Sequence, residues 1–288
     1  MSRILILGAT GFLGGWLSEH LKSLNHEVIS HGYSSRSDIN CDLSNLSQVR
    51  SLIAKVAPDV IINLVALTNV DYCEVHPNEA SLINITIVEN IVSVIEENQS
   101  STYLVQISTD MVYDHPGEND EGNICIRNIY ALTKLQGEEV AQRINSVVLR
   151  TNFFGHHKKC PNKGLVGWII ESLKEEKNIT VFDDIFFSPV SIATLCDLIA
   201  LVIDGRISGI YNLGSWGGMS KAEFARKLAF KLCLPFNYMH PSPYGLNIDT
   251  PVSRPRDMRM SMLKIESSLR IKLPCLDDEI NKFGELYV

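Results

Sequence analysis

Short apolar runs rich in β-branched residues recur through the first half of the chain, separated by longer segments with helical periodicity. Runs that are apolar on both faces predict buried strands of a parallel sheet. The predicted strands are RILILG (3–8), EVISH (27–31), DVIINL (59–64), TYLVQIS (102–108) and SVVLRT (146–151). The predicted helices span about 12–24, 45–56, 79–98 and 128–144. Such alternation implies right-handed crossovers and an α/β fold with a doubly wound parallel sheet, a Rossmann fold.

The second half of the chain is less regular. Residues 191–204 predict a helix, and GIYNLG (209–214) predicts a strand that rejoins the sheet. The remaining segments are rich in Pro and Trp, which predicts a smaller, discontinuous lobe with the substrate cleft beside it. The expected domains are 1–152 with about 189–213, for NADP binding, and about 153–188 with 214–288, for substrate binding.

Composition narrows the possible functions. The 288 residues are 45% hydrophobic and carry a formal net charge of −7 without a long Lys/Arg run, so a nucleic-acid partner is not expected. The N-terminus lacks a signal-peptide pattern, and the longest apolar run (59–70) is too short to span a bilayer, so we expect a cytoplasmic protein with no membrane partner. Seven scattered cysteines suit reduced thiols.

His156, His157 and Cys160 lie close enough in sequence to suggest a metal site. These residues belong to the basic stretch GHHKKCPNKG, and no second cluster of ligands is present to complete a tetrahedron. We interpret the stretch as an exposed loop and predict no metal.

A glycine-rich turn follows the first predicted strand. Gly8, Gly11 and Gly14 have G-x-x-G-x-x-G spacing between that strand and the first helix. Glycines permit a tight turn and close approach to a pyrophosphate, and the helix N-terminus offers free N–H groups. The alternative is a purely structural turn, but the order strand, turn, helix favours dinucleotide binding.

The end of the second strand bears on the choice of cofactor. NAD enzymes of this design usually carry an acidic residue about 20 positions on, which binds the ribose 2′-hydroxyl. Here the stretch has His31, Tyr33, Ser34 and Arg36, and no carboxylate before Asp38. Arginine and hydroxyls suit a 2′-phosphate, so NADP(H) is favoured over NAD(H), although Arg36 as a solvated loop charge is the alternative.

Five motifs in order resemble the extended short-chain dehydrogenase/reductase family: the glycine turn, NLVALTNVD, QISTDMVYD, YALTK and VLRTNFFG. The best match is the dTDP-4-dehydrorhamnose reductase branch of nucleotide-sugar ketoreductases. Its typical stretches are matched by Asn63–Asp71, Ser108–Asp114 and the Arg-Pro segment that begins at Ser253. The resemblance covers essentially the whole chain.

The resemblance implies NAD(P)H-dependent reduction of the C4 ketone of a nucleoside-diphosphate 4-keto-6-deoxysugar, in surface-polysaccharide or related biosynthesis. Tyr130 would protonate the developing alkoxide, and Thr109 would hydrogen-bond the same oxygen. Lys134, four residues after Tyr130, lies on the same helix face. A cation there lowers the pKa of a phenol and can also donate to the nicotinamide ribose.

The resemblance also implies the binding residues. The cofactor contacts are Gly8, Thr10, Gly11, Phe12, Leu13, Gly14, Arg36, Asp42, Leu43, Ala66, Tyr130, Lys134 and Asn152. Asp42 is expected either to accept a hydrogen bond from the adenine or to cap the next helix, for which Ser44 and Asn45 are the other candidates. The substrate contacts are Thr68, Asp110, Met111, Phe153 and Arg254. Arg254 is the first choice for the diphosphate, ahead of Arg256 and Arg259.

Three positions depart from the reductase pattern. Met111 and Leu67 replace tyrosines, and Phe153 replaces a tryptophan, which leaves the identity of the sugar open. Related 4,6-dehydratases carry Asp-Glu after the threonine, whereas this chain has Asp110-Met111, which argues against dehydration.

Two other functions fit the same motifs. One is a non-catalytic NADP-binding subunit resembling the methionine adenosyltransferase regulatory subunit, and the other is a nucleotide-sugar epimerase. The family resemblance further implies a homodimer.

Overall fold

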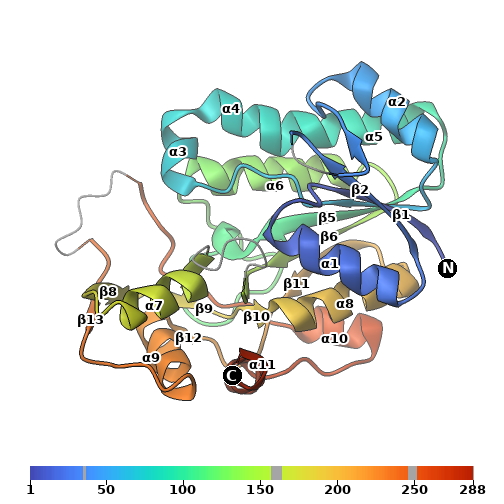
Figure 1. Ribbon diagram of the computed structural model, residues 1–288. Helices are drawn as coiled ribbons and strands as arrows, with labels where there is room; N and C mark the ends of the chain where they lie inside the picture. The colour runs from blue at the N-terminus through green and yellow to red at the C-terminus, as the bar shows by residue number, and fades with distance from the viewer. Residues whose placement is uncertain (35–36, 157–163, 246–251, 288) are drawn as a thin grey trace. The chain divides into compact units, whose positions relative to one another are not determined.

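The computed structural model describes residues 1–34, 37–156, 164–245 and 252–287. The chain divides into two compact units, each built from discontinuous segments (Figure 1). Unit 1 comprises Met1–Thr109, Asn128–Arg150 and Cys196–Tyr211, and unit 2 comprises Asp110–Arg127, Thr151–Leu195 and Asn212–Val288. The sequence-based domains placed 110–127 in the first domain, whereas this segment belongs to unit 2. The roles assigned to the two domains stay predictions.

A seven-stranded sheet, ordered β11-β6-β5-β4-β1-β2-β3, is the framework of unit 1. Its strands are β1 (Arg3–Leu7), β2 (Glu27–Gly32), β3 (Ile39–Asn40), β4 (Val60–Asn63), β5 (Tyr103–Thr109), β6 (Ser146–Thr151) and β11 (Gly209–Leu213). β1 pairs in parallel with β2 and β4, so that Leu7 lies between His31 and Asn63. The strand order changes direction at β1 and β4, which is where doubly wound sheets bind ligands. The predicted fold class is confirmed.

Helices cover both faces of this sheet. Figure 1 shows α2, α4, α5 and α6 on one side and α1 and α8 on the other. Their bounds are α1 (Phe12–Ser23), α2 (Leu46–Val56), α3 (Val70–Val75), α4 (Pro77–Ser81), α5 (Ile87–Glu97), α6 (Ile129–Ala141) and α8 (Ile192–Gly205). Strand residues such as Leu5, Ile61 and Leu104 form one buried cluster with Ile91 of α5. Burial on both faces explains why the strands are apolar throughout.

Side-chain caps define where two helices of unit 1 begin. Asn45 Oδ1 accepts hydrogen bonds from the main-chain nitrogens of Ser47 (3.0 Å) and Gln48 (3.3 Å) at the start of α2. Asn45 is therefore the cap of that helix. Asn128 Oδ1 accepts from the Ala131 nitrogen at 2.9 Å and caps α6, which carries the Tyr-x-x-x-Lys motif.

The helix predicted for 79–98 is present as continuous helical backbone from Pro77 to Glu97, but the prediction did not include an irregular turn inside it. A π-helical turn, η1 (Leu82–Thr86), separates α4 from α5. A Cβ atom placed on Gly137 of α6 would lie 2.4 Å from the Asn84 carbonyl oxygen, so the backbones of η1 and α6 are in close contact. Hydrophobic periodicity does not record this approach, because it depends on a glycine in a different helix. Such π-bulges often occur at functional sites.

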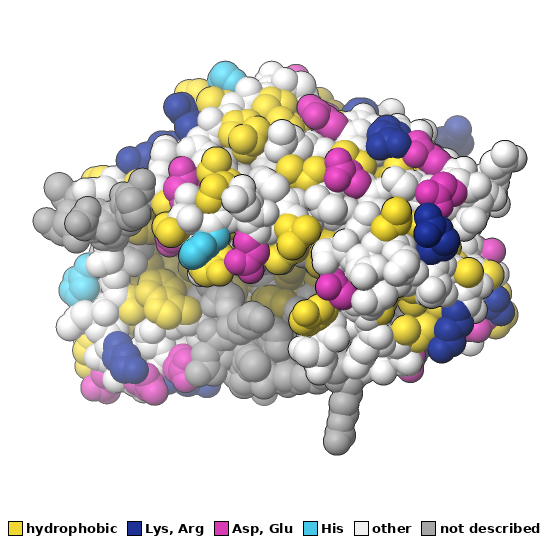
Figure 2. All heavy atoms as spheres, turned by 90° about the horizontal axis from the view of Figure 1, so that it is seen from above, with side chains coloured by type: hydrophobic (Ala, Val, Ile, Leu, Met, Phe, Trp, Pro, Cys, Tyr) yellow, Lys and Arg dark blue, Asp and Glu magenta, His cyan; other side chains and the backbone are white. Residues whose placement is uncertain are grey.

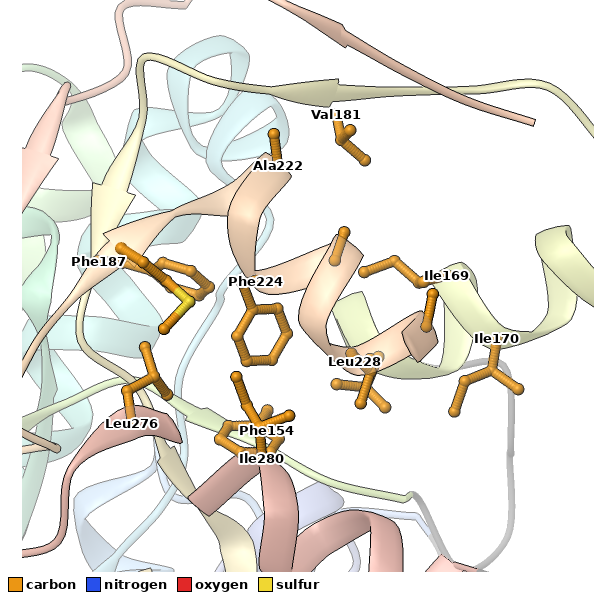
Figure 3. Packing of buried hydrophobic residues seen from close by; sticks show 14 of the residues in the cluster. Phe154, Ile169, Ile170, Val181, Phe187, Ala222, Phe224, Leu228, Leu276 and Ile280 are labelled. Carbon is orange, nitrogen blue, oxygen red and sulfur yellow. The ribbon is translucent and has the colours of Figure 1, made fainter. Parts of the chain in front are cut away.

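Unit 2 contains three small sheets: β12-β9-β14, β10-β7 and β13-β8. Their strands are β7 (Phe153–Phe154), β8 (Ile179–Phe182), β9 (Phe186–Phe187), β10 (Val190–Ser191), β12 (Met219–Ser220), β13 (Met239–Ser242) and β14 (Asp257–Met258). The helices are the 3-10 turn η2 (Asp110–Val112), α7 (Gly164–Lys174), α9 (Lys221–Lys231), α10 (Leu263–Leu269) and α11 (Leu276–Tyr287). Phe224 of α9 packs edge-on against Phe154 and Phe187, with ring centroids 5.1 and 5.3 Å apart (Figure 3). These aromatic contacts are part of the hydrophobic core of this unit.

The surface carries charged side chains of both signs, as the composition of the chain indicates. On the face drawn in Figure 2, acidic and basic side chains are interspersed with hydrophobic ones among the described residues. In the part of the chain that the structure describes, no helix is long and apolar enough to cross a membrane.

Candidate functional site

The turn between β1 and α1 requires its glycines. Gly8 has φ +77°, a conformation that favours glycine, and its carbonyl accepts a hydrogen bond from the Gly11 nitrogen at 3.0 Å. A Cβ atom on Gly14 would lie 2.6 Å from the Ala9 Cα atom, so α1 can pack onto the turn only with glycine there. Gly11 precedes α1 without any side-chain cap, which leaves the first N–H groups of the helix available to a ligand.

A cavity of about 650 Å³ opens at this turn, and residues that follow β1, β2 and β4 contribute to its wall. It brings together Gly8, Thr10, Gly11, Asp42, Leu43 and Ala66 from the predicted cofactor set. Phe12 and Leu13 begin α1 directly after the turn. A cavity at the switch point of the sheet, with helix N–H groups at its edge, fits the diphosphate and adenosine portion of a dinucleotide.

Asp42 organises the loop that enters α2. Its Oδ1 accepts hydrogen bonds from the Ser44 nitrogen (2.9 Å) and the Ser44 hydroxyl (2.7 Å). Asp42 is therefore not the cap of α2, since Asn45 fills that position. Its contact with an adenine stays a prediction.

His31, at the end of β2, was not among the expected cofactor contacts. It lines the cavity and is 2% exposed. Nε2 lies 3.1 Å from the Cys41 carbonyl oxygen, whereas the buried Nδ1 has no hydrogen-bond partner among the described residues. Burial lowers the pKa of His31, which favours the neutral ring. Its position at the strand end, where dinucleotide folds contact the ribose, was the available sequence signal.

The first carboxylate after β2 turns back onto the strand. Asp38 Oδ2 accepts hydrogen bonds from the Ser30 nitrogen (2.8 Å) and the Ser30 hydroxyl (2.7 Å). These bonds lower the pKa of the Asp38 carboxyl and hold it ionised. Arg36, expected at a 2′-phosphate, lies outside the described residues, as do His157 and Cys160.

Tyr130 and Lys134 are both buried on α6, with 8% and 4% of their surface exposed. The Lys134 ammonium donates a hydrogen bond to the Ile107 carbonyl oxygen of β5 at 2.7 Å. Thr109, 5% exposed, ends the same strand two residues later. This hydrogen bond therefore joins α6, which carries Tyr130 and Lys134, to the end of β5, which carries Thr109. Burial lowers the pKa of Lys134 to about 8.

Asn84, in the π-helical turn, is a second residue that sequence reasoning missed. Its Oδ1 accepts from the Leu67 nitrogen at 2.9 Å, and its Nδ2 donates to the Leu67 carbonyl oxygen at 3.2 Å. Nδ2 also donates to the Thr133 hydroxyl of α6 at 3.0 Å. One buried amide thus joins α6 to the loop that follows β4, directly after the cavity residue Ala66. A lone asparagine inside an apolar helix was the only available signal.

Unit 2 holds most of the expected substrate residues. Asp110 begins η2, is 1% exposed, and accepts a hydrogen bond from Asn152 Nδ2 at 2.7 Å. Asn152, expected at the cofactor, thus belongs to unit 2 and is engaged with Asp110. Met111 packs against the core of this unit, and Phe153 begins β7. Thr68, by contrast, lies exposed in unit 1.

Lys221, the first residue of α9, was also not expected. It is partly buried, and its ammonium lies 6.0 Å above the Phe187 ring. Burial lowers the pKa of Lys221, nearby Asp110 raises it, and Arg254 lowers it. Lys221, Arg254 and Asp110 therefore form one charged group within unit 2. Because Lys221 stands at the start of a short polar helix, its sequence context did not indicate that it interacts with Asp110 and Arg254.

The other two arginines of the Arg-Pro segment have carboxylate partners. Arg256 Nη1 lies 2.5 Å from Asp184 Oδ2, and its guanidinium stacks 4.8 Å from the Tyr244 ring centroid. Arg259 Nε donates to Asp257 Oδ1 at 2.8 Å. Both side chains are engaged in holding unit 2 together. Within the described parts of the chain, no group of three His, Cys, Asp or Glu side chains is placed to hold a metal ion.

The fold and these sites define a Rossmann-type α/β protein with a glycine turn and a buried tyrosine–lysine helix. The chain belongs to the RmlD substrate binding domain family, whose model matches residues 1–287. The family expected from the motifs is confirmed.

Named relatives span nearly the whole chain. It is 28% identical to dTDP-4-dehydrorhamnose reductase of Shigella flexneri, covering 94% of this chain and 93% of the relative. It is also 29% identical to methionine adenosyltransferase 2 subunit beta of Xenopus laevis, covering 92% of this chain and 81% of the relative. Among solved structures, dTDP-4-dehydrorhamnose reductase of Bacillus anthracis in complex with NADP superposes with a TM-score of 0.88, at 26% identity and 99% coverage of both chains.

Proposed function

We propose that this protein is an oxidoreductase that reduces the C4 ketone of a nucleoside-diphosphate 4-keto-6-deoxysugar with NADPH. The observation that carries the proposal is the fastening of buried Lys134 to the Ile107 carbonyl oxygen at 2.7 Å. This contact fixes the helix of Tyr130 against the strand that ends in Thr109. Relatives named as dTDP-4-dehydrorhamnose reductases support the same reaction.

The chain's own residues supply acid catalysis and orientation. Tyr130 donates its proton to the oxygen that becomes the C4 hydroxyl, and Thr109 donates a hydrogen bond to that oxygen. Lys134 keeps a positive charge beside the phenol and orients the nicotinamide ribose. The nicotinamide, when bound, supplies the hydride.

NADPH is proposed over NADH because of the residues that follow β2. The first carboxylate, Asp38, is engaged with Ser30, and the strand end presents a neutral imidazole, His31, to the cavity. An acidic group that would bind a 2′-hydroxyl and repel a 2′-phosphate is therefore not supplied by Asp38. The solved relative bound to NADP supports the same choice. Fluorescence titration should give a lower Kd for NADPH than for NADH, and equal values would contradict this choice.

The diphosphate of the substrate is assigned to Arg254 and Lys221. Both are cations of unit 2 in mutual electrostatic contact, so a doubly charged anion relieves their repulsion. Asp110 and Asn152 lie in the same unit and offer polar groups for a sugar.

The experiment that tests the proposed function is NADPH oxidation with a panel of nucleoside-diphosphate 4-keto-6-deoxysugars that includes dTDP-4-dehydrorhamnose. Rapid oxidation with one member, lost in Tyr130→Phe, is expected. Tight NADPH binding without oxidation across the panel would favour a non-catalytic subunit. The 29% identity to methionine adenosyltransferase 2 subunit beta is the observation behind that second candidate.

The oligomeric state and one alternative function are further proposals. A homodimer is proposed from the family resemblance, and sedimentation velocity should give a mass near twice the 32.2 kDa of one chain. An epimerase is the remaining alternative. It would be revealed by NAD that stays bound through purification.

A further inference from the structure

A buried ion pair lies one helical turn beyond Lys134. The Glu138 and Arg150 side chains are 0% and 2% exposed. Arg150 Nη2 donates to Glu138 Oε2 at 2.6 Å, and Nε lies 3.1 and 3.0 Å from the two carboxylate oxygens. Ser108 of β5 donates its hydroxyl to Glu138 Oε1. A pair this deeply buried costs desolvation energy, and an apolar pair of similar volume often serves stability as well or better.

The pair is joined to the site through β5. Lys134 and Glu138 are four residues apart on α6, so they lie on the same face of the helix. Lys134 donates to the carbonyl oxygen of Ile107, and Glu138 accepts from the hydroxyl of the next residue, Ser108. The two contacted residues, Ile107 and Ser108, directly precede Thr109 in β5. The lysine and the ion pair therefore share one strand end with the threonine.

The charged groups on the helices that pack against α6 are exposed to solvent. Strand β5 contributes the uncharged Ile107 carbonyl and Ser108 hydroxyl, and η1 contributes the uncharged amide of Asn84. The carboxylates on α3, α4 and α5 are all exposed to solvent: Asp71, Glu74, Glu79, Glu89, Glu96 and Glu97. Among the described residues of unit 1, the buried Lys, Arg, Asp and Glu side chains are thus Lys134, Glu138 and Arg150.

We propose that Glu138 and Arg150 are positioning residues for the proposed reduction: Glu138 supports Lys134 as an ammonium, and Arg150 holds the Glu138 carboxylate in place. The proposal rests on the assigned roles of Tyr130 and Lys134. The Glu138–Arg150 pair is neutral in total, so the ammonium of Lys134 is the unbalanced charge of the three. In a region of low dielectric that ammonium favours the phenolate that remains when Tyr130 gives up its proton, and the pair acts on this step only through Lys134.

The effect on Lys134 follows from opposing causes. Burial lowers the pKa of Lys134 to about 8, and the carboxylate of Glu138 raises it. Without that carboxylate the lysine would lose its proton at a lower pH, within the range where the enzyme is expected to work. Arg150 is needed as well, because without it the buried Glu138 carboxylate would lose the guanidinium that donates to both of its oxygens.

The test is a titration that needs no substrate. The protein is labelled with [ε-13C]lysine, and the Lys134 signal is assigned by its loss in Lys134→Arg. NMR spectra recorded over a range of pH then give the midpoint of the Lys134 titration, the pH at which half of its ammonium has lost a proton. The main variant is Glu138→Gln/Arg150→Met, which removes the pair without leaving one charge buried alone. Its Lys134 midpoint is expected to fall by about one pH unit relative to the unmodified protein. Glu138→Gln alone is expected to move the midpoint in the same direction.

A matched control separates this effect from general loss of a buried carboxylate. Glu279, in unit 2, is 2% exposed and accepts from the Ser191 nitrogen (2.7 Å) and the Thr194 hydroxyl (2.9 Å). Glu279→Gln is expected to leave the Lys134 midpoint unchanged. An equal shift in this control would overturn the proposal.

Two further outcomes overturn the proposal. One is an unchanged Lys134 midpoint in the folded double variant, whether or not any sugar is turned over. The other is a shifted midpoint while the alkaline limb of kcat/KM stays in place. If no sugar in the panel reacts, the proposed function fails separately, and the NMR midpoint alone decides whether the pair controls Lys134.

Discussion

Tyr130 and Lys134, the residues proposed to act in the reduction, lie in an environment unlike that of most surface helices. An exposed Tyr-x-x-x-Lys pair on a helix is common and inert. Here both side chains are nearly buried, and the ammonium is fixed on the Ile107 carbonyl oxygen. In low dielectric, a fixed cation affects a neighbouring phenol far more than it does in water. The chemistry therefore depends on the environment of these two residues.

Tyr130→Phe tests the proton donor. The variant should lose about 10²- to 10⁴-fold in kcat, because general acid catalysis contributes on that scale. NADPH affinity, measured by fluorescence titration, should stay within about twofold, since the ring that packs in the site is retained. Tyr113→Phe is a matched control, because Tyr113 is buried in unit 2 on Asn212. Full activity in Tyr130→Phe would remove the assigned role.

The pH profile tests Lys134. Below a pH of about 8 the ammonium is charged, and above it the neutral amine predominates. A neutral amine neither supports the phenol nor donates as strongly to the ribose, so kcat/KM for reduction should fall as pH rises through about 8. A steady-state pH series with saturating NADPH measures this. A flat profile between pH values on either side of that midpoint would contradict the role of Lys134.

The elements that carry the site begin and end for local reasons. Asn45 and Asn128 cap the helices α2 and α6, and Gly8 adopts the positive φ that the first turn needs. The close approach of α1 to the turn depends on Gly14, whereas nothing lies within 4 Å of a Cβ atom placed on Gly15. Two adjacent glycines thus have different structural roles.

Replacing each of these glycines by alanine tests the turn. Gly14→Ala should lower the free energy of unfolding by about 1–3 kcal/mol and weaken NADPH binding, because the new methyl group overlaps the Ala9 backbone. Gly15→Ala should stabilise the protein by roughly 0.5–1 kcal/mol, since alanine favours helix. Denaturant unfolding and NADPH titration measure both effects. Equal behaviour of the two variants would refute this account of the turn.

Asn84→Ala tests the π-helical turn. It removes hydrogen bonds to Leu67 and Thr133, so the free energy of unfolding should fall by about 1–3 kcal/mol. NADPH affinity should fall too, because the Leu67 loop continues from the cavity residue Ala66. Asn78→Ala, at an exposed position of α4, is the control and should change neither quantity. Unchanged NADPH binding in a folded Asn84→Ala protein would contradict the link to the cavity.

Sequence periodicity was sufficient for elements whose cause is local. The central strands, the glycine turn and the α6 helix follow from apolar runs, glycine spacing and helical periodicity. Features caused by contacts distant in sequence were not predictable: the π-helical turn that faces Gly137, the cavity position of His31, and the partial burial of Lys221. The family resemblance supplied the tyrosine–lysine chemistry, which spacing alone did not determine.

At the scale of the whole molecule, the proposed work is divided between two units. Unit 1 contains the glycine turn, the cavity and the tyrosine–lysine helix. Unit 2 contains Lys221 together with Arg254 and Asp110, two charged residues that both act on its pKa. The net charge of −7 makes such a local positive group unusual for this chain, which is consistent with an anionic ligand.

Lys221→Met tests this division. Loss of a charge-assisted contact to the diphosphate should raise KM for the nucleotide sugar by about tenfold or more. The Kd for NADPH should not change, because the cofactor is assigned to unit 1. Arg256→Met is the control, since Arg256 is held by Asp184, and it should affect stability more than KM. An unchanged KM in Lys221→Met would remove this residue from the substrate site.

The central claim is transfer of hydride from NADPH to C4 of the sugar, with Tyr130 as the acid. The most direct measurement uses NADPH with deuterium at both C4 positions of the nicotinamide together with dTDP-4-dehydrorhamnose, followed by mass spectrometry and NMR of the product. The account predicts one deuterium per product molecule, located at sugar C4, and transfer slower by about 10²- to 10⁴-fold with Tyr130→Phe. Tight binding of the deuterated cofactor without transfer to any sugar of the panel would contradict it.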